Sequence, residues 1–360
     1  MKKLIALFLT LSIVLSAFGV STILPVMAET SPVKLQIDFE GRNAENKVEG
    51  FGDGQIVGSP TFVESYDGSV ALHIENDFSK TAQQYLKISD ASIGDGDFTV
   101  SFWYQATDCG GQGEFSGSSD AEYSGFKNWA NTQGGTVFST GDTLEVSNNG
   151  VSVLNLPKPF YGTFTLSDGT TTINSSNRLN HGVLENITDT RWHKIQVVFD
   201  KTAGNVAVYV DGVSTFSQSV SSFGSVNSGL GSIGFGADAL GQYGALSASF
   251  DDIEICTTAL KETDISNNFA KDNLKKLINN IKNDLIEAEV GTRFTFEAIE
   301  NMSDALSSAN ATLSNSESDF VAIYEELNGK YLQFLEGNEP IKSILITSDT
   351  HLKAGTSATF

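Results

Sequence analysis

The residues best suited to metal chemistry are Asp349 and His351, near the last residue of the sequence. They follow the run Ile341 to Ile346, which is largely apolar, as in a buried strand. Residues i and i+2 at the end of a strand project to the same side. A carboxylate and an imidazole placed in this way offer mixed oxygen and nitrogen ligation that suits Mn, Fe or Zn. The spacing predicts a metal-ligating pair, and the alternative is an ordinary polar turn.

This segment resembles the opening block of the calcineurin-like metallophosphoesterases, whose first strand ends in Asp-x-His. The resemblance implies one metal of a two-metal site, which activates water for in-line phosphoryl displacement. The family's later Gly-Asp, Gly-Asn-His and Gly-His-x-His blocks do not occur in the nine residues after His351. We therefore expect residues 341–360 to be the truncated start of such a domain, and we expect no hydrolysis of phosphate esters by this chain.

The rest of the sequence contains no complete catalytic constellation. It has no Gly-x-Ser-x-Gly elbow, no P-loop and no His-Glu-x-x-His motif. The Glu-x-Asp-x-x-Glu signature of jelly-roll glucanases is also missing. His73 and His193 lie in strand-like runs, and we interpret both as structural. Binding is therefore favoured over catalysis.

The first 28 residues have the pattern of a signal peptide. Met1-Lys2-Lys3 is basic, Leu4 to Val20 is mostly apolar, and Val26-Met27-Ala28 suits cleavage before Glu29. An uncleaved membrane anchor is the alternative. No other apolar run reaches eighteen residues, so we expect no membrane span after cleavage. The pattern predicts a secreted or cell-surface protein, and the two-lysine signal suits a bacterium.

The composition is that of a globular protein with a strong acidic balance. Hydrophobic residues make up 40% of the chain, charged residues 18%, and the formal net charge is −22. This charge argues against nucleic-acid binding, which needs a Lys/Arg surface. It suits an extracellular protein, or one that attracts divalent cations.

Residues 33–260 consist of short β-branched and aromatic runs separated by Gly, Asp, Asn and Ser. Many short strands with turn residues between them indicate a sandwich or barrel. Trp192 is placed to anchor a strand entry in the core. Asp211-Gly212, between two hydrophobic runs, predicts a hairpin.

Five stretches in this region resemble, in order, the strands of LamG-like (concanavalin A-like) jelly rolls. They are Phe98–Tyr104, Gly135–Asp142, Thr190–Asp200, Asn205–Gly212 and Phe250–Leu260. The resemblance implies a LamG-like jelly-roll β-sandwich over residues 33–260. Residues 108–133 depart from it and form a Gly/Ser-rich insertion.

The resemblance also implies a recognition role, with a glycan or a cell-surface protein as partner. Ligand-contact candidates are the aromatic residues in or beside the insertion: Tyr104, Phe115, Tyr123, Phe126 and Trp129. The alternative is that these rings fold the insertion onto the sandwich. Many LamG-like domains carry structural calcium, and Glu40, Asp251 and Asp252 are candidate ligands since the terminal strands should lie close together. Solvated or N-capping carboxylates are the alternative.

The two cysteines, Cys109 and Cys256, could form a disulfide in an exported protein. Their separation in sequence does not establish one. Two cysteines are too few for a Cys-rich scaffold or a cysteine zinc site.

Composition changes after Leu260, where three series of apolar residues recur at helical spacing. They comprise Leu274, Leu277, Ile278, Ile281, Leu285 and Ile286; Phe294, Ala298, Met302, Ala305 and Leu306; and Phe320, Ile323, Tyr324, Leu327, Tyr331 and Leu335. We expect a small helical bundle over residues 263–338, similar to the FIVAR-type spacers of bacterial surface proteins. A solvated helical stalk is the alternative.

The favoured hypothesis is an exported recognition module that binds carbohydrate or a surface protein and forms the targeting half of a larger secreted protein. The alternatives are a fragment of a secreted metallophosphoesterase, inactive as this chain, and a purely structural adhesin or spacer. The fold class predicted is mainly β: a jelly-roll sandwich, then a small α-helical bundle, then a short C-terminal strand fragment.

Overall fold

The structure is a computed structural model. It describes residues 32–76, 82–108, 135–141, 149–155, 162–174, 184, 187, 189–242, 246–287, 294–315, 317–336, 344–346 and 352–354. The predicted signal peptide, residues 1–28, lies outside these ranges.

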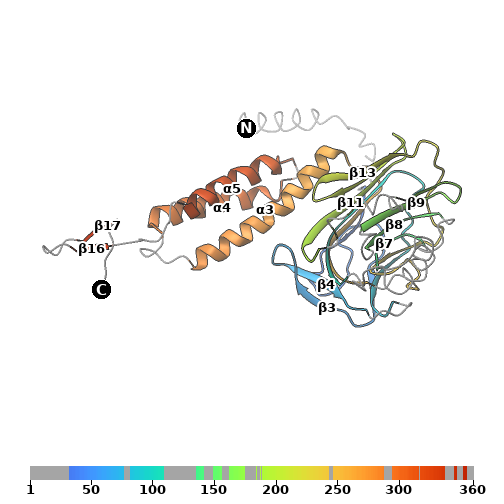
Figure 1. Cartoon of the computed structure of the whole chain (residues 1–360), viewed down its shortest axis with the longest axis horizontal. Helices are drawn as coiled ribbons and strands as arrows, with labels where there is room; N and C mark the ends of the chain where they lie inside the picture. The colour runs from blue at the N-terminus through green and yellow to red at the C-terminus, as the bar shows by residue number, and fades with distance from the viewer. Residues whose placement is uncertain are drawn as a thin grey trace, which may run out of the picture. The chain divides into compact units, whose positions relative to one another are not determined.

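Two antiparallel sheets form a sandwich (Figure 1). The first, sheet A, contains in spatial order β13 (Val213–Ser219), β12 (Asn205–Val210), β11 (Trp192–Asp200), β6 (Phe98–Asp108), β15 (Ser247–Cys256), β4 (Val70–Ile74) and β3 (Thr61–Glu64), with β1 (Val33–Ile37) also paired to β15. The second, sheet B, contains β10 (Thr172–Asn174), β9 (Gly162–Ser167), β8 (Gly150–Asn155), β7 (Gly135–Ser139), β14 (Ser232–Phe235), β5 (Tyr85–Ser89) and β2 (Gly54–Val57).

The core between the sheets is rich in phenylalanine. The ring of Phe102 lies 5.3 Å from that of Phe235, 6.1 Å from that of Phe138 and 6.3 Å from that of Phe250. These rings come from both sheets, so they join the two layers. Close aromatic packing of this kind stabilises a core beyond simple burial of area. The predicted β-sandwich is confirmed.

The Asp211-Gly212 hairpin forms as predicted, as the two-residue connection between β12 and β13. Both residues have positive φ, 53° and 75°, which suits the tight turn that joins twisted strands. The Asp211 carboxylate also accepts a hydrogen bond from the Lys194 amide at 2.9 Å. Trp192 differs from expectation: it is half-buried and meets the edge of Tyr66 at 6.3 Å, instead of entering the core between the sheets.

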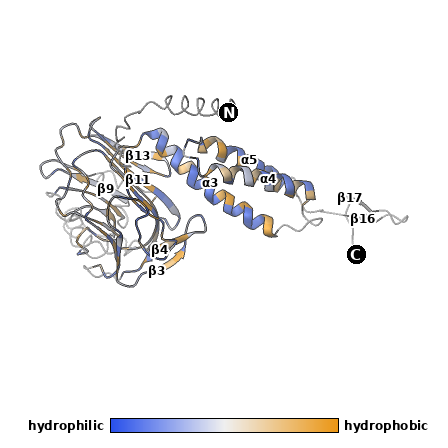
Figure 2. Cartoon of the chain, turned by 180° about the vertical axis from the view of Figure 1, so that it is seen from behind, coloured by the Kyte–Doolittle hydropathy of each residue, from blue (hydrophilic) through white to orange (hydrophobic). Residues whose placement is uncertain are grey.

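Three helices follow: α3 (Glu262–Glu287), α4 (Phe296–Thr312) and α5 (Phe320–Glu336). Apolar and hydrophilic residues alternate along each of them (Figure 2). The apolar residues form a common core that includes Leu274, Met302 and Leu327, as predicted from their spacing. Ile286 differs, because it is 82% exposed. The helical bundle is thus confirmed, with a narrower apolar face on α3 than the sequence suggested.

A second face of α3 packs on the outer surface of sheet A. Ile265 is fully buried there, in one cluster with Val198, Ala207 and Tyr209 of β11 and β12. Phe269, one turn further, lies 6.0 Å from the Trp103 ring. The two predicted domains, residues 33–260 and 263–338, are therefore in direct contact through a packed interface.

Beyond the bundle, a short hairpin joins β16 (Ile344–Ile346) and β17 (Leu352–Ala354). In the part of the chain that the structure describes, no helix is both long and apolar enough to cross a membrane.

We expect Ile265→Ala to lower the free energy of unfolding by about 2–5 kcal/mol, the usual cost of truncating a buried Ile to Ala. The matched control is Ile286→Ala, the same change on the exposed side of the same helix, which should alter it by less than about 0.5 kcal/mol. Urea unfolding followed by tryptophan fluorescence measures both. Equal effects of the two substitutions would show that α3 does not pack on the sandwich in solution.

Candidate functional site

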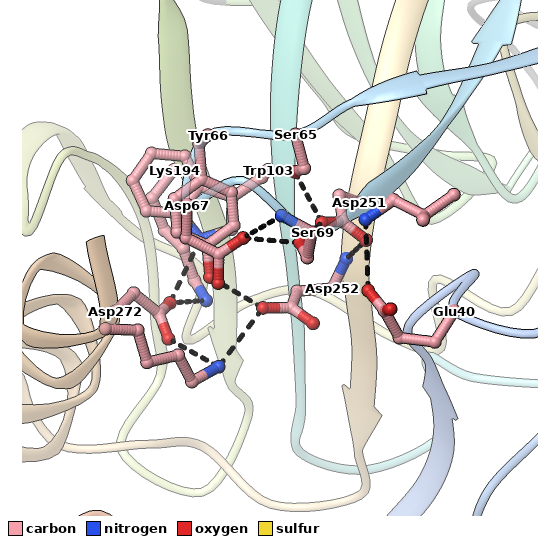
Figure 3. A network of polar contacts seen from close by, with 12 residues as sticks. Glu40, Ser65, Tyr66, Asp67, Ser69, Trp103, Lys194, Asp251, Asp252 and Asp272 are labelled. Atoms are coloured by element: carbon pink, nitrogen blue, oxygen red, sulfur yellow. Dashed lines mark hydrogen bonds and ion pairs between the residues drawn. The ribbon is translucent and has the colours of Figure 1, made fainter. Parts of the chain in front are cut away.

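A network of charged and polar side chains lies where α3 crosses sheet A (Figure 3). Its starting point is an irregularity in β15, whose register shifts between Asp251 and Glu254. Asp252 at this bulge has φ of 44°, an uncommon conformation for a residue with a side chain. As a result, the neighbouring carboxylates of Asp251 and Asp252 reach different partners.

Asp251 is 1% exposed and accepts hydrogen bonds from side chains of the turn between β3 and β4. Ser65 Oγ donates to Asp251 Oδ2 at 2.5 Å, and Ser69 Oγ lies 3.3 Å from the same atom. Burial, together with the neighbouring charge of Asp252, raises the pKa of Asp251 to about 8. Burial thus favours the protonated form of this carboxyl group.

Asp252 points instead toward α3. Its Oδ2 accepts a hydrogen bond from the Tyr66 hydroxyl at 2.7 Å and lies 3.4 Å from Lys275 Nζ. The Tyr66 ring stacks on Trp103, with centroids 3.9 Å apart and planes 13° apart. Burial, and then the nearby carboxylates, raises the pKa of Tyr66 far above its usual value, so this hydroxyl remains a donor.

Asp272 of α3 occupies the other side of the network. Its Oδ2 lies 2.5 Å from Lys194 Nζ and accepts the Trp103 indole N–H at 3.0 Å, and its Oδ1 lies 3.5 Å from Lys275 Nζ. Burial disfavours the charged form of Asp272, but the two ammonium groups outweigh burial and lower its pKa. Asp272 is therefore an ionised carboxylate held by two cations and an indole.

A polar cavity of about 150 Å³ adjoins this network. Its lining comprises Gln36, Ser101, Lys194, Asp252, Glu254, Asn268, Lys271, Asp272 and Lys275. Gln196 lies directly across the strand pair from Ser101, is fully buried, and has no hydrogen-bond partner for its amide among the described residues. A space of this size and polarity suits a few water molecules.

The calcium candidates do come close together, since β1 pairs with β15. Glu40 Oε1 accepts the Val70 amide at 3.0 Å and lies beside Asp251 (Figure 3). However, Ser65, Tyr66 and Lys275 already bind the two aspartates. Among the described residues, no group of three or more His, Cys, Asp or Glu could hold a metal ion. The residues as they stand do not fit a calcium site.

The aromatic ligand candidates divide into two groups. Tyr104 is fully buried and packs 5.6 Å from Phe250, so its ring belongs to the core and cannot contact a ligand on the surface. Phe115, Tyr123, Phe126 and Trp129 lie outside the described residues. The proposed metal pair of the C-terminal segment, Asp349 and His351, also lies outside them. Those assignments stay predictions.

The strand register contradicts the Cys109–Cys256 disulfide. In the β15–β6 pair, Cys256 is opposite Thr99, whereas Ser247 is opposite Asp108, the residue before Cys109. Nine residues of strand separate these positions, about 30 Å at the usual rise. A disulfide requires Cα atoms within about 7 Å. Cys256 is a buried free thiol, and burial raises its pKa.

Sequence reasoning missed Tyr66, Trp103, Lys194, Asp272 and Lys275. Ile265, Phe269, Asp272 and Lys275 recur at intervals of three or four residues along α3 and so share one face. That second helical face, distinct from the apolar series, was the available signal. Nothing in the sequence alone paired it with β6 and β11.

The comparisons with known proteins concern the sandwich. A sequence profile described as the concanavalin A-like lectin/glucanases superfamily matches residues 80–266. This is the class of protein that the two-sheet fold suggests, and the chain belongs to that superfamily. A search of curated proteins gave no match.

Solved structures similar to the chain include two binding domains and one domain of an arabinanase. The binding domain of Paraclostridial mosquitocidal protein 1 has a TM-score of 0.48 and 12% identity, covering 67% of this chain and 52% of that one. Domain 4 of an extracellular arabinanase from Geobacillus stearothermophilus, in complex with arabinotriose, has a TM-score of 0.44 and 14% identity, and the match covers 66% of this chain and 98% of that one. The botulinum neurotoxin DC binding domain, in complex with rat synaptotagmin II, has a TM-score of 0.43 and 15% identity, and the match covers 66% of this chain and 51% of that one. This chain thus spans about half the length of the two chains that contain these binding domains.

His193 lies at the beginning of β11 in sheet A, between two carboxylates. Its Nδ1 lies 2.7 Å from Asp211 Oδ2 and its Nε2 lies 2.9 Å from Asp189 Oδ1. Because ionised carboxylates only accept hydrogen bonds, this geometry favours the charged ring, in which both nitrogens donate. Burial opposes this charge, but the two carboxylates outweigh burial and raise the pKa of His193. The structural role predicted for this histidine agrees with these contacts.

We expect His193→Gln to lower the free energy of unfolding by about 1.5–3 kcal/mol at pH 6, the range for hydrogen bonds to charged groups. A histidine whose pKa is raised in the folded state contributes its full stabilisation of the fold below about pH 6.5, the pKa of the unfolded state. This contribution is lost as the pH rises through the pKa of the folded state. The difference between wild type and variant should therefore shrink above pH 6.5. Urea unfolding between pH 5 and about pH 9 measures it.

The control for this experiment is His73→Gln, because the described partner of the His73 ring is the neutral Ser249 hydroxyl at 3.0 Å. Its effect at pH 6 should be smaller than that of His193→Gln, because no hydrogen bond to a charged group is lost. A His193→Gln difference that stays constant across the pH range would contradict the assignment of a charged His193 ring.

Proposed function

We propose that this chain is an exported recognition module that binds a carbohydrate or a surface protein and targets a longer protein to it. The observation that carries the proposal is membership of the concanavalin A-like lectin/glucanases superfamily over residues 80–266. The polar network does not suggest catalysis, since its carboxylates and ammonium groups are engaged with one another across the α3 interface.

The position of α3 limits where a ligand could bind. Ile265 and Asp272 cover the outer side of sheet A over β6, β11 and β12. A ligand would therefore bind through sheet B or through the loops at the ends of the sandwich. Sheets and loops of this kind are usual sites of recognition on a rigid scaffold.

Sheet B carries a row of small and polar residues on the face opposite the core. Pairing across the strands aligns Lys87, Gly234, Ser139, Ser152 and Thr165. The residues next to them along the strands point to the core: Leu86, Ile88, Ile233, Phe235, Phe138, Val151, Val153, Phe164 and Leu166. Ser139 and Ser152 are buried, while Lys87 and Thr165 are half-buried. The Ser139 hydroxyl donates to the Gly141 carbonyl at 2.8 Å and lies 3.0 Å from Ser152 Oγ. Within this row a polar ligand such as a sugar would therefore reach Lys87 and Thr165, which supply an ammonium and a hydroxyl group.

The mature chain from Glu29 onward should bind one or more glycans on an array, or cells that display them. We expect Thr165→Trp, which places a bulky ring on the outer side of sheet B, to weaken that binding at least about tenfold, a loss of ~1.4 kcal/mol. The matched control is Ser214→Trp on the exposed strand β13 of sheet A, which should bind as the wild type does. Titration calorimetry with the best glycan measures the affinities.

Failure to bind any glycan or cell surface, with or without calcium, would favour a purely structural spacer. Equal binding by both tryptophan variants would keep the recognition role and move the ligand to the loops. The array should use the chain with its helices, because truncation after Leu260 removes Ile265 and Asp272 and uncovers the apolar and charged surface beneath them.

A further inference from the structure

Half of the large apolar side chains that are exposed in the described part of the chain lie at one end of the helical bundle. They are between 39% and 82% exposed, and they come from the end of α3, the start of α4 and the end of α5. Exposed apolar residues scattered singly need no explanation, whereas a group of them at one place marks a contact surface. We call this surface the bundle end and define it by Ile286, Phe296, Leu332 and Leu335.

Contacts between the three helices bring these residues to the same place. The rings of Phe294 and Phe334 stack with centroids 4.5 Å apart, which places the start of α4 against the end of α5. The Tyr331 hydroxyl donates a hydrogen bond to the Asp284 carboxylate, which places the end of α5 against the end of α3. The apolar side chains of the bundle end therefore surround a packed contact without being covered by it.

The bundle end is acidic as well as apolar. Helices α3 and α5 end here at Glu287 and Glu336, and neither has a basic residue in its last turn. Helix α4 begins here with Glu297 in its first turn. The C-terminus of a helix carries a partial negative charge, so a lysine is favoured beside it. A partner that fits the bundle end is therefore an apolar segment that carries a lysine.

The chain supplies such a segment soon after α5. Residues 341–346, Ile-Lys-Ser-Ile-Leu-Ile, are apolar apart from Lys342 and Ser343. Strands β16 and β17 form a two-stranded sheet of their own. A hairpin of two strands is at best marginally stable in water and needs a surface to pack on.

The length of chain between α5 and the hairpin allows it to reach this surface. Ile344 follows Glu336 by eight residues, which span at most about 26–29 Å. Helices in a bundle lie about 8–10 Å apart, so the hairpin can reach all three of them. A short tether also keeps the hairpin at an effective concentration of about millimolar, so a weak contact suffices.

We propose that the bundle end is a docking surface for residues 341–354 of the same chain. The apolar run covers the exposed side chains of the bundle end, and Lys342 supplies the positive charge that the ends of α3 and α5 lack. The C-terminal segment is thereby held against the helices, which sets the direction in which the chain leaves the bundle. The inference does not depend on the recognition function, because it concerns a different part of the molecule.

The experiment is amide hydrogen exchange in the mature chain, followed by mass spectrometry of peptides that cover residues 341–354. Exchange reports local opening, which global unfolding in urea does not detect. The amides of β16 and β17 should be protected in the wild type. The double variant Phe296→Ser/Leu335→Ser should exchange them at least about tenfold faster, a loss of ~1.4 kcal/mol. Both residues are exposed, so the variant should keep the bundle core intact.

The matched control is Val321→Ser, near the other end of α5, because Val321 and Leu335 are equally exposed, at 39%. It should leave the exchange of the hairpin amides unchanged. Lys342→Gln should speed their exchange by about two- to fivefold at low salt, and by less in 1 M NaCl, which screens the charge. Glycan binding should be the same in the wild type and in all variants, so this result is distinguishable from failure of the recognition proposal.

Three results would overturn the proposal. Wild-type hairpin amides that exchange as fast as those of an unstructured peptide would show that the segment does not dock. Equal exchange in the wild type and in Phe296→Ser/Leu335→Ser would show that it packs on a different surface. Protection that increases with protein concentration, together with a dimer in sedimentation velocity, would show that a second copy of the chain occupies the bundle end.

Discussion

The junction depends on the buried carboxylate of Asp272. Moving a carboxylate and an ammonium out of water is costly, and their attraction offsets that cost only where geometry is good and every oxygen is satisfied. Here Lys194 of β11, Trp103 of β6 and Lys275 of α3 satisfy Asp272 from three elements at once. A shift of α3 by one residue would leave both Asp272 and Lys194 buried without partners. The pair therefore fixes the position of α3 on sheet A more than it adds to stability.

This constraint explains why the sandwich and the helices are not separate modules. Apolar packing of Ile265 alone would allow α3 to slide along the sheet, because hydrophobic contacts are not directional. The ion pairs remove that freedom. The same helix then carries the bundle core on its other side through Leu274 and Ile281. The sandwich is thus connected to the bundle through one continuous helix.

The sequence predicts well what depends on local pattern. Strand alternation, the Asp211-Gly212 turn and the helical periodicity each follow from neighbours in the chain, and all are present. The burial of Tyr104 could also have been predicted, since it shares strand parity with Phe98 and Phe102 and must face the core with them. Its place beside the insertion favoured a ligand contact instead, and that signal was the weaker of the two.

The polar network could not be predicted, because its residues come together only through two features of the tertiary fold. The first is the crossing of α3 over sheet A, which brings Asp272 and Lys275 to strands far away in sequence. The second is the bulge in β15, without which Asp251 and Asp252 would point to opposite faces of a regular strand. The bulge instead gives one acid to a buried turn and the other to the helix. In the sequence, the adjacent aspartates suggest a set of metal ligands. The fold instead places Asp251 against the Ser65 hydroxyl and Asp252 against Tyr66 and Lys275.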